Sequence, residues 1–89
     1  MNLDKLITGF VDAITDIQVS LKEEQYGAII YGDDNVALFN EKTVANNDNN
    51  LLCLEGDDAV IYLNPLQVLS IGYNKKDKAP DYQQIDKND

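Results

Sequence analysis

The sequence predicts a single α+β domain in which an N-terminal amphipathic helix packs on a small antiparallel β-barrel of five strands. Three observations predict this class. Apolar residues recur at helical spacing over residues 2–18, apolar runs of strand length fill much of residues 19–73, and residues 74–89 are polar and charged. A chain of 89 residues with 44% hydrophobic residues suffices for one domain, residues 1–73, with a modest core.

The first segment, residues 2–18, carries an apolar stripe along one helical face. Its members recur every three or four positions: Leu3, Leu6, Ile7, Phe10, Val11, Ile14 and Ile17. Asn2 is a suitable N-cap, and Asp4 complements the helix dipole. Gly9 lowers helix stability by about 1 kcal/mol relative to alanine and would permit a close backbone approach. We expect the stripe to cover the core, with partner binding as the alternative.

A nearly repeated phrase of nine residues predicts two β-hairpins. Residues 32–40 read GDDNVALFN and residues 56–64 read GDDAVIYLN, so five of nine positions are identical at an interval of 24 residues. Glycine supplies the positive φ that tight turns need, and aspartate can hydrogen-bond to its own backbone. Each Gly-Asp-Asp turn therefore joins two apolar strands, which are residues 27–31 and 36–40 in one hairpin and 51–54 and 59–63 in the other.

The remaining segments complete this pattern. Residues 19–22 alternate between apolar and polar, so we expect strand character there, followed by a polar turn at residues 23–25. Residues 43–50 are rich in Asn and Asp, which predicts a solvated loop. Residues 64–67 contain Asn-Pro, which favours a turn because proline cannot continue a central strand. Residues 68–73 form the last predicted strand.

A hairpin, one helical turn beginning near Pro65 and a short closing strand together resemble the end of small β-barrels of the SH3-like and Sm-like kind. The resemblance covers Val19 to Tyr73 and implies a closed barrel over that region. The sequence has no Arg-Gly signature of Sm proteins, so their RNA-binding role is not implied. It also has no aromatic groove of the kind found in peptide-binding SH3 domains.

Negative charge is concentrated on the part of the chain that is predicted to fold. Residues 74–89 carry four lysines and four aspartates, so the formal net charge of −9 belongs to residues 1–73. This charge disfavours direct binding of nucleic-acid phosphates and favours a basic protein surface. We expect residues 74–89 to be a flexible tail, with docking through Tyr82 and Ile85 as the alternative.

Residue types that catalysis and metal binding usually require are missing. The chain has no histidine and no arginine, and its single cysteine, Cys53, lies in an apolar run with no histidine to activate it. The Gly-Asp-Asp turns lack a third carboxylate for Mg²⁺, and residues 46–50 lack the glycine and glutamate positions of a calcium loop. The sequence therefore predicts a protein that is not an enzyme and has no cofactor or metal.

No apolar run reaches the roughly 18 residues of a membrane span, and the acidic N-terminus does not resemble a signal peptide. One cysteine cannot form an intrachain disulfide and fits a reducing compartment. These features predict a cytoplasmic protein without membrane contact.

Small size, concentrated acidic charge and the lack of arginine favour an interaction module that docks on a basic protein surface. The sharpest version is an inhibitor from a phage or mobile element, of the anti-defence or nucleic-acid-mimic type. The candidate partner-binding residues are acidic groups at predicted turns: Asp33, Asp34, Glu55, Asp57, Asp58, Glu23 and Glu24. Two alternatives stay open, a homo-oligomeric or accessory subunit and a small-ligand sponge formed between protomers.

Overall fold

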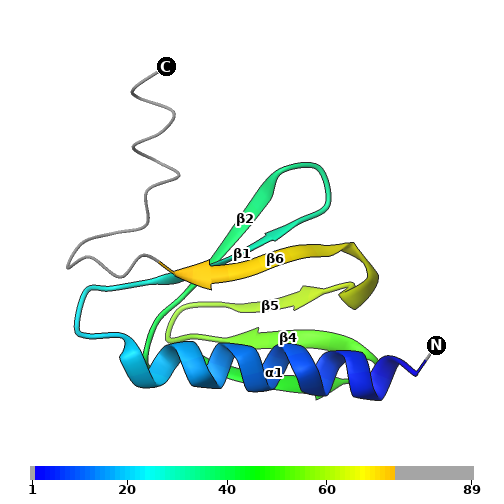
Figure 1. The fold of residues 1–89 in the computed structure, drawn as a ribbon, viewed down its shortest axis with the longest axis horizontal. Helices are drawn as coiled ribbons and strands as arrows, with labels where there is room; N and C mark the ends of the chain where they lie inside the picture. Colours follow the sequence, from blue (N-terminus) through cyan, green and yellow to red (C-terminus); the bar gives the residue numbers. More distant parts are fainter. Residues whose placement is uncertain (1, 74–89) are drawn as a thin grey trace.

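The fold is one α-helix packed on two three-stranded antiparallel sheets (Figure 1), which confirms the α+β class. This computed structural model describes residues 2–73, so the predicted tail lies outside the described residues. One sheet has the strand order β2-β1-β6 and the other β3-β4-β5. In chain order the elements are α1 (Leu3–Ser20), β1 (Gly27–Tyr31), β2 (Asn35–Phe39), β3 (Val44–Asp48), β4 (Leu51–Glu55), β5 (Val60–Leu63), the 3-10 helix η1 (Pro65–Gln67) and β6 (Val68–Tyr73).

The predicted closed barrel of five strands over residues 19–73 is wrong for the part of the chain that the structure describes. Six strands form two open sheets, and no strand ladder joins one sheet to the other. The sheets separate at residues 40–43, where Lys42 N donates to Asn40 Oδ1 at 2.9 Å and Thr43 N donates to Asn40 O at 3.2 Å. This hydrogen-bonded turn takes the chain from β2 into β3, so the two sheets meet through side chains.

The helix extends past the predicted end at residue 18, and the strand expected from Val19 does not form. Asn2 caps α1 as predicted, with its Oδ1 accepting a hydrogen bond from Lys5 N at 3.3 Å. At the other end Leu21 is the C-cap, and its N donates to Gln18 O at 3.1 Å. The alternating pattern of residues 19–22 is therefore not that of a strand. Val19 is exposed on the last helical turn, and Leu21, at the C-cap, is buried in the core.

Residues 44–48 form β3, which contradicts the predicted loop over residues 43–50. The turn preference of Asn and Asp is outweighed here because all five residues of β3 pair with β4. Asn47 Nδ2 also donates to Asp4 Oδ1 at 2.8 Å, which links β3 to α1. The turn itself is confined to Asn49 and Asn50, which both have positive φ.

Both predicted Gly-Asp-Asp hairpins form, as does the turn at Asn64-Pro65. In the first hairpin Gly32 has φ +59° and Asp34 has φ +62°. In the second, Gly56 N donates to Ala59 O at 2.9 Å. Asn64 Oδ1 accepts from Leu66 N at 2.9 Å and caps η1, so Pro65 occupies a helix start, where its missing N–H is harmless.

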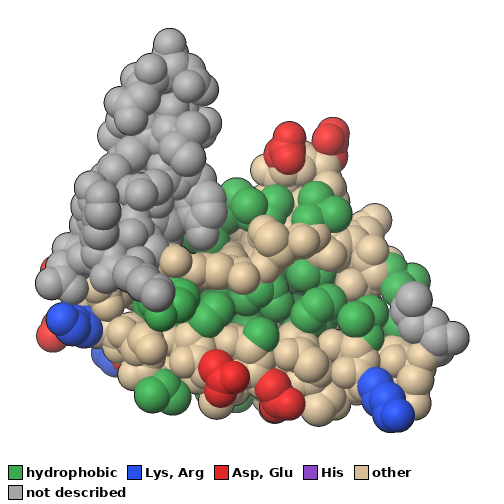
Figure 2. Space-filling view, in the orientation of Figure 1, with side chains coloured by type: hydrophobic (Ala, Val, Ile, Leu, Met, Phe, Trp, Pro, Cys, Tyr) green, Lys and Arg blue, Asp and Glu red, His purple; other side chains and the backbone are tan. Residues whose placement is uncertain are grey.

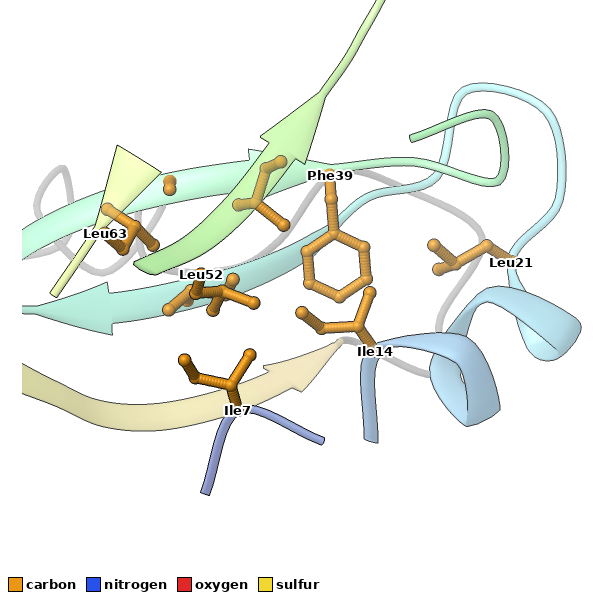
Figure 3. Close-up of a cluster of buried hydrophobic side chains, with 9 residues drawn as sticks. Ile7, Ile14, Leu21, Phe39, Leu52 and Leu63 are labelled. Carbon is orange, nitrogen blue, oxygen red and sulfur yellow. The ribbon is translucent and has the colours of Figure 1, made fainter. Parts of the chain in front are cut away.

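The hydrophobic core lies between α1 and the inner faces of the sheets (Figure 3). In that view Ile7 and Ile14 point from α1 toward Leu52 and Phe39. Full burial of one such side chain contributes roughly 1.5–3 kcal/mol. The buried cluster consists of Ile7, Ile14, Leu21, Ile29, Ala37, Phe39, Leu52, Leu54 and Leu63.

Phe39 packs tightly against Gly27, which it faces across β1 and β2. The Phe39 side chain is only 1% exposed, and its ring lies directly over Gly27. A Cβ atom added to Gly27 would lie 2.2 Å from Phe39 Cζ, so no larger residue fits without displacing the ring.

We predict that Gly27→Ala lowers the free energy of unfolding by about 1–3 kcal/mol, because the added methyl group forces the Phe39 ring out of its position. Urea unfolding followed by circular dichroism measures this. Gly72→Ala on β6 is the matched control, since a Cβ there meets nothing within 4 Å. Equal losses in the two variants would contradict the packing described.

Gly9 does not mark a close backbone approach, because an added Cβ would meet nothing within 4 Å. We predict that Gly9→Ala raises the free energy of unfolding by about 0.5–1 kcal/mol, through the higher helix propensity of alanine. Thermal unfolding checks the sign. A lowered melting temperature would show that α1 needs glycine at this position.

Candidate functional site

A half-open cavity of about 250 Å³ lies where the β4–β5 turn approaches the end of β2. Buried side chains such as Phe39 and Leu54 provide an apolar floor, while Asp57, Asp58 and Lys42 are exposed at the rim. The cavity therefore combines an apolar interior with charged groups of both signs. Its lining residues are Tyr26, Leu38, Phe39, Asn40, Lys42, Thr43, Leu54, Gly56, Asp57, Asp58, Ala59 and Ile61.

The wall formed by residues 40–43 is held in place by the C-terminal end of α1. Gln18 Nε2 donates to Asn40 O at 2.9 Å and to Thr43 O at 2.5 Å. Within the turn, Asn40 N donates to Thr43 Oγ1 at 3.0 Å. Because Lys42 lies between these two residues, the position of its backbone at the cavity rim depends on α1.

The turn that precedes β1 presents two more acidic residues near the cavity. Gln25 is buried, its Oε1 accepts from Lys22 N at 2.7 Å, and its N donates to Lys22 O at 3.0 Å. These bonds fix a turn in which Glu24 has φ +67° and Glu23 is exposed. The next residue, Tyr26, lines the cavity, so both glutamates lie at the cavity end of the fold.

The structure brings five of the seven predicted partner-binding residues to one end of the fold. Asp57 and Asp58 line the cavity, and Glu55 is the last residue of β4, just before their turn. Glu23 and Glu24 belong to the adjoining turn before Tyr26. The other two, Asp33 and Asp34, belong to the first Gly-Asp-Asp turn, which lies elsewhere.

Asp33 and Asp34 lie at the opposite end of the first hairpin from Gly27 and Phe39. Gly32 N donates to Gln67 O at 2.9 Å, so this turn sits beside η1, away from the cavity. Figure 1 shows the β1–β2 turn and the β4–β5 turn at different ends of the molecule, and Figure 2 shows acidic side chains at the projecting β1–β2 tip. The two turns therefore do not form one acidic surface.

Sequence reasoning did not single out Tyr26, Lys42 or Gln18 as site residues. Tyr26 only precedes an apolar run, and Lys42 lies in a polar stretch with no motif. Gln18 reaches residues more than twenty positions away in the chain, and no local pattern signals such a contact. The one weak sequence signal for Lys42 is that it is one of three lysines in residues 1–73, so a positive charge is rare in this part of the chain.

Cys53 and Tyr62 face each other across β4 and β5. Electrostatic repulsion by Cys53, first, and by Asp48 disfavours the tyrosinate form and holds the pKa of Tyr62 above its ordinary value. The Cys53 thiol is buried and not in a disulfide, and the chain has no histidine to pair with it. This group offers packing rather than an activated nucleophile.

Within residues 2–73, no group of three or more cysteine or acidic side chains could hold a metal ion. Over the same residues, no helix combines the length and the apolar character that crossing a membrane requires. Comparisons of the chain with protein-family models, curated proteins and solved structures found no match.

We predict that Gln18→Leu lowers the free energy of unfolding by about 1–3 kcal/mol, because it removes two hydrogen bonds: Thr43 O loses its bond to the helix, and Asn40 O keeps only the bond from Thr43 N. Urea unfolding measures the loss. Gln67→Leu is the control, since that side chain is exposed in η1 and should change stability by less than about 0.5 kcal/mol. If the two variants are equally stable, Gln18 does not hold the cavity wall.

Proposed function

We propose that this protein is a non-enzymatic interaction module that docks on a basic partner and receives one lysine or arginine side chain in the cavity beside Asp57 and Asp58. The observation that carries the proposal is the pairing of two carboxylates with an apolar floor. A lysine or arginine side chain has an apolar stem and a cationic head, so it matches both parts.

The size of the cavity supports a side chain as its occupant. Small-molecule pockets usually measure about 300–1,000 Å³. At about 250 Å³ and half open to solvent, this cavity is below that range. A single side chain projecting from a protein surface fits such a volume better than a free ligand, which would leave much of its surface in water.

The charge of the domain supports attraction of a basic partner over a longer range. Residues 1–73 carry the whole formal net charge of −9, and Glu23, Glu24 and Glu55 lie at the cavity end. The electrostatic field of these charges raises the association rate with a cationic surface, and added salt weakens this field. Lys42 is the one basic residue among those lining the cavity, so it opposes the incoming cation.

The separation of the two Gly-Asp-Asp turns favours a local docking site over an extended nucleic-acid mimic. A mimic presents a row of carboxylates along one surface, spaced like backbone phosphates. Asp33 and Asp34 do not extend the row at the cavity because their turn lies beside η1. An inhibitor from a phage or mobile element remains the biological setting that we propose for such a module.

We also propose that the fold is an open variant of the SH3-like and Sm-like small barrels. The support is the order of elements, in which a 3-10 helix precedes the last strand and β1 lies between β2 and β6. This likeness concerns architecture alone and brings no ligand or partner with it.

We predict that a lysine- and arginine-rich peptide binds the chain and that Asp57→Asn/Asp58→Asn weakens this binding about tenfold or more, since a charge-assisted hydrogen bond contributes about 1.5–3 kcal/mol. Isothermal titration calorimetry measures the affinity. The control is Asp33→Asn/Asp34→Asn, which removes the same charge from the other turn. Equal weakening by both variants would reduce the binding to general attraction and contradict the site.

Two further measurements sharpen this test. Lys42→Gln should strengthen peptide binding, because it removes the cation at the rim, and added NaCl should weaken it. The same two double variants can be tested with a natural partner recovered from cell lysate. Loss of capture only in Asp57→Asn/Asp58→Asn indicates binding at the cavity, and equal loss in both variants indicates attraction by net charge. Competition by DNA would favour the mimic form of the proposal.

A further inference from the structure

The outer edge of β5 is an unprotected strand edge. In residues 2–73, β5 is hydrogen-bonded only to β4, so its other edge carries unpaired backbone groups. Three consecutive large hydrophobic residues of this strand are exposed: Val60 by 48%, Ile61 by 36% and Tyr62 by 53%. Proteins usually block such an edge with a charge, a proline, a bulge or a covering element, because exposed edges pair with other chains.

The other three outer strands of the described sheets each have one of these protections. β3 packs against α1, and Asn47 of β3 donates a hydrogen bond to Asp4 of α1. β6 has an irregular register, in which Ile30 pairs with Ser70 and Tyr31 with Val68, so Leu69 is left over as a bulge. β2 has charged residues beyond both of its ends, at 33–34 and 41–42, whereas β5 has them beyond one end only, at Asp57 and Asp58.

β5 also lies in the longest neutral part of this acidic chain. No residue between Asp58 and Lys75 is charged, and this stretch contains β5, η1 and β6. Two acidic molecules repel each other wherever their charged surfaces meet. The β5 edge is therefore a place where a second copy of this chain can approach closely without placing charge against charge.

We propose that two copies of this chain pair through β5 in an antiparallel arrangement about a two-fold axis. Antiparallel pairing of a strand with its own copy is self-complementary, as a two-fold interface requires. It joins two three-stranded sheets into one sheet of six strands, in the order β3-β4-β5 followed by the partner's β5, β4 and β3. The exposed Val60 and Tyr62 side chains of the two copies then lie on the same face of that sheet.

The antiparallel direction also follows from the charges that flank β5. Asp57 and Asp58 precede the strand, and uncharged Asn64 and Pro65 follow it. Antiparallel pairing sets the acidic turn of one copy beside the neutral end of the other, whereas parallel pairing would set the two acidic turns together. The same operation on β2 would bring Asp34 toward Glu41 of the partner, and these two would repel.

Self-pairing goes beyond the proposed docking function and does not depend on it. The cavity lies at the β4–β5 turn and is lined by one residue of β5, Ile61, whereas the pairing uses the free backbone edge of the strand. The dimer would therefore present two cavities, one at each end of the joined β5 strands, to a partner with repeated basic sites. A strand of four residues gives a small interface, so the dimer should dissociate on dilution.

Sedimentation equilibrium of the full chain over a dilution series tests the proposal. The expected mass is twice the 10.0 kDa of one chain at high concentration and falls toward 10.0 kDa on dilution. Val60→Lys should abolish the increase, and Tyr62→Lys is a second variant in case the first does not fold. The matched control is Leu69→Lys, which places the same charge on the bulged edge and should leave dimerisation unchanged.

Salt separates this proposal from the docking function. NaCl should raise the dimer fraction by screening the repulsion of two acidic chains, whereas it should weaken binding of a basic peptide. Asp57→Asn/Asp58→Asn should lose peptide binding and keep the dimer, while Val60→Lys should do the reverse. A mass of 10.0 kDa at every concentration overturns the proposal, and so does a dimer lost in Leu69→Lys but kept in Val60→Lys.

Discussion

The position of the Phe39 ring over Gly27 is the constraint on which the rest of this structure depends. The ring fixes the register of the first hairpin at the point where β1 begins and β2 ends. It also belongs to the core cluster that holds α1 against both sheets. The next residue, Asn40, starts the turn that Gln18 binds from the helix. Displacement of the ring would therefore disturb the first hairpin and the turn at residues 40–43, which leads into β3 and forms one wall of the cavity.

Local signals in the sequence predicted the elements whose stability is local. The apolar stripe and Asn2 predicted α1, and the Gly-Asp-Asp phrases predicted both hairpin turns. Two features were missed. β3 forms against the turn preference of its Asn residues because the neighbouring strand β4 supplies a complete ladder. The break between the sheets was missed because it depends on Gln18 meeting residues 40–43, which the sequence does not signal.

The repeated phrase illustrates why sequence similarity within a chain does not set position in space. Both copies form turns that expose two aspartates, but their backbones differ: Gly32 and Asp34 have positive φ, whereas Gly56 does not and instead donates its N–H to Ala59 O. Their surroundings differ, since one turn is bonded to η1 through Gly32 and the other closes over a cavity beside Phe39. The same three residues thus form different turns in different surroundings, and we propose that only the second receives a basic side chain.

Acidic turns and a neutral strand edge divide the surface into two regions with opposite responses to salt. We propose that the acidic cavity end binds a basic partner and that the β5 edge binds a second copy. Amide hydrogen exchange of the full chain, with and without basic peptide and at two protein concentrations, tests this division most directly. Peptide should protect residues 56–59, and higher protein concentration should protect residues 60–63. Protection of the same residues by both treatments would contradict two separate surfaces.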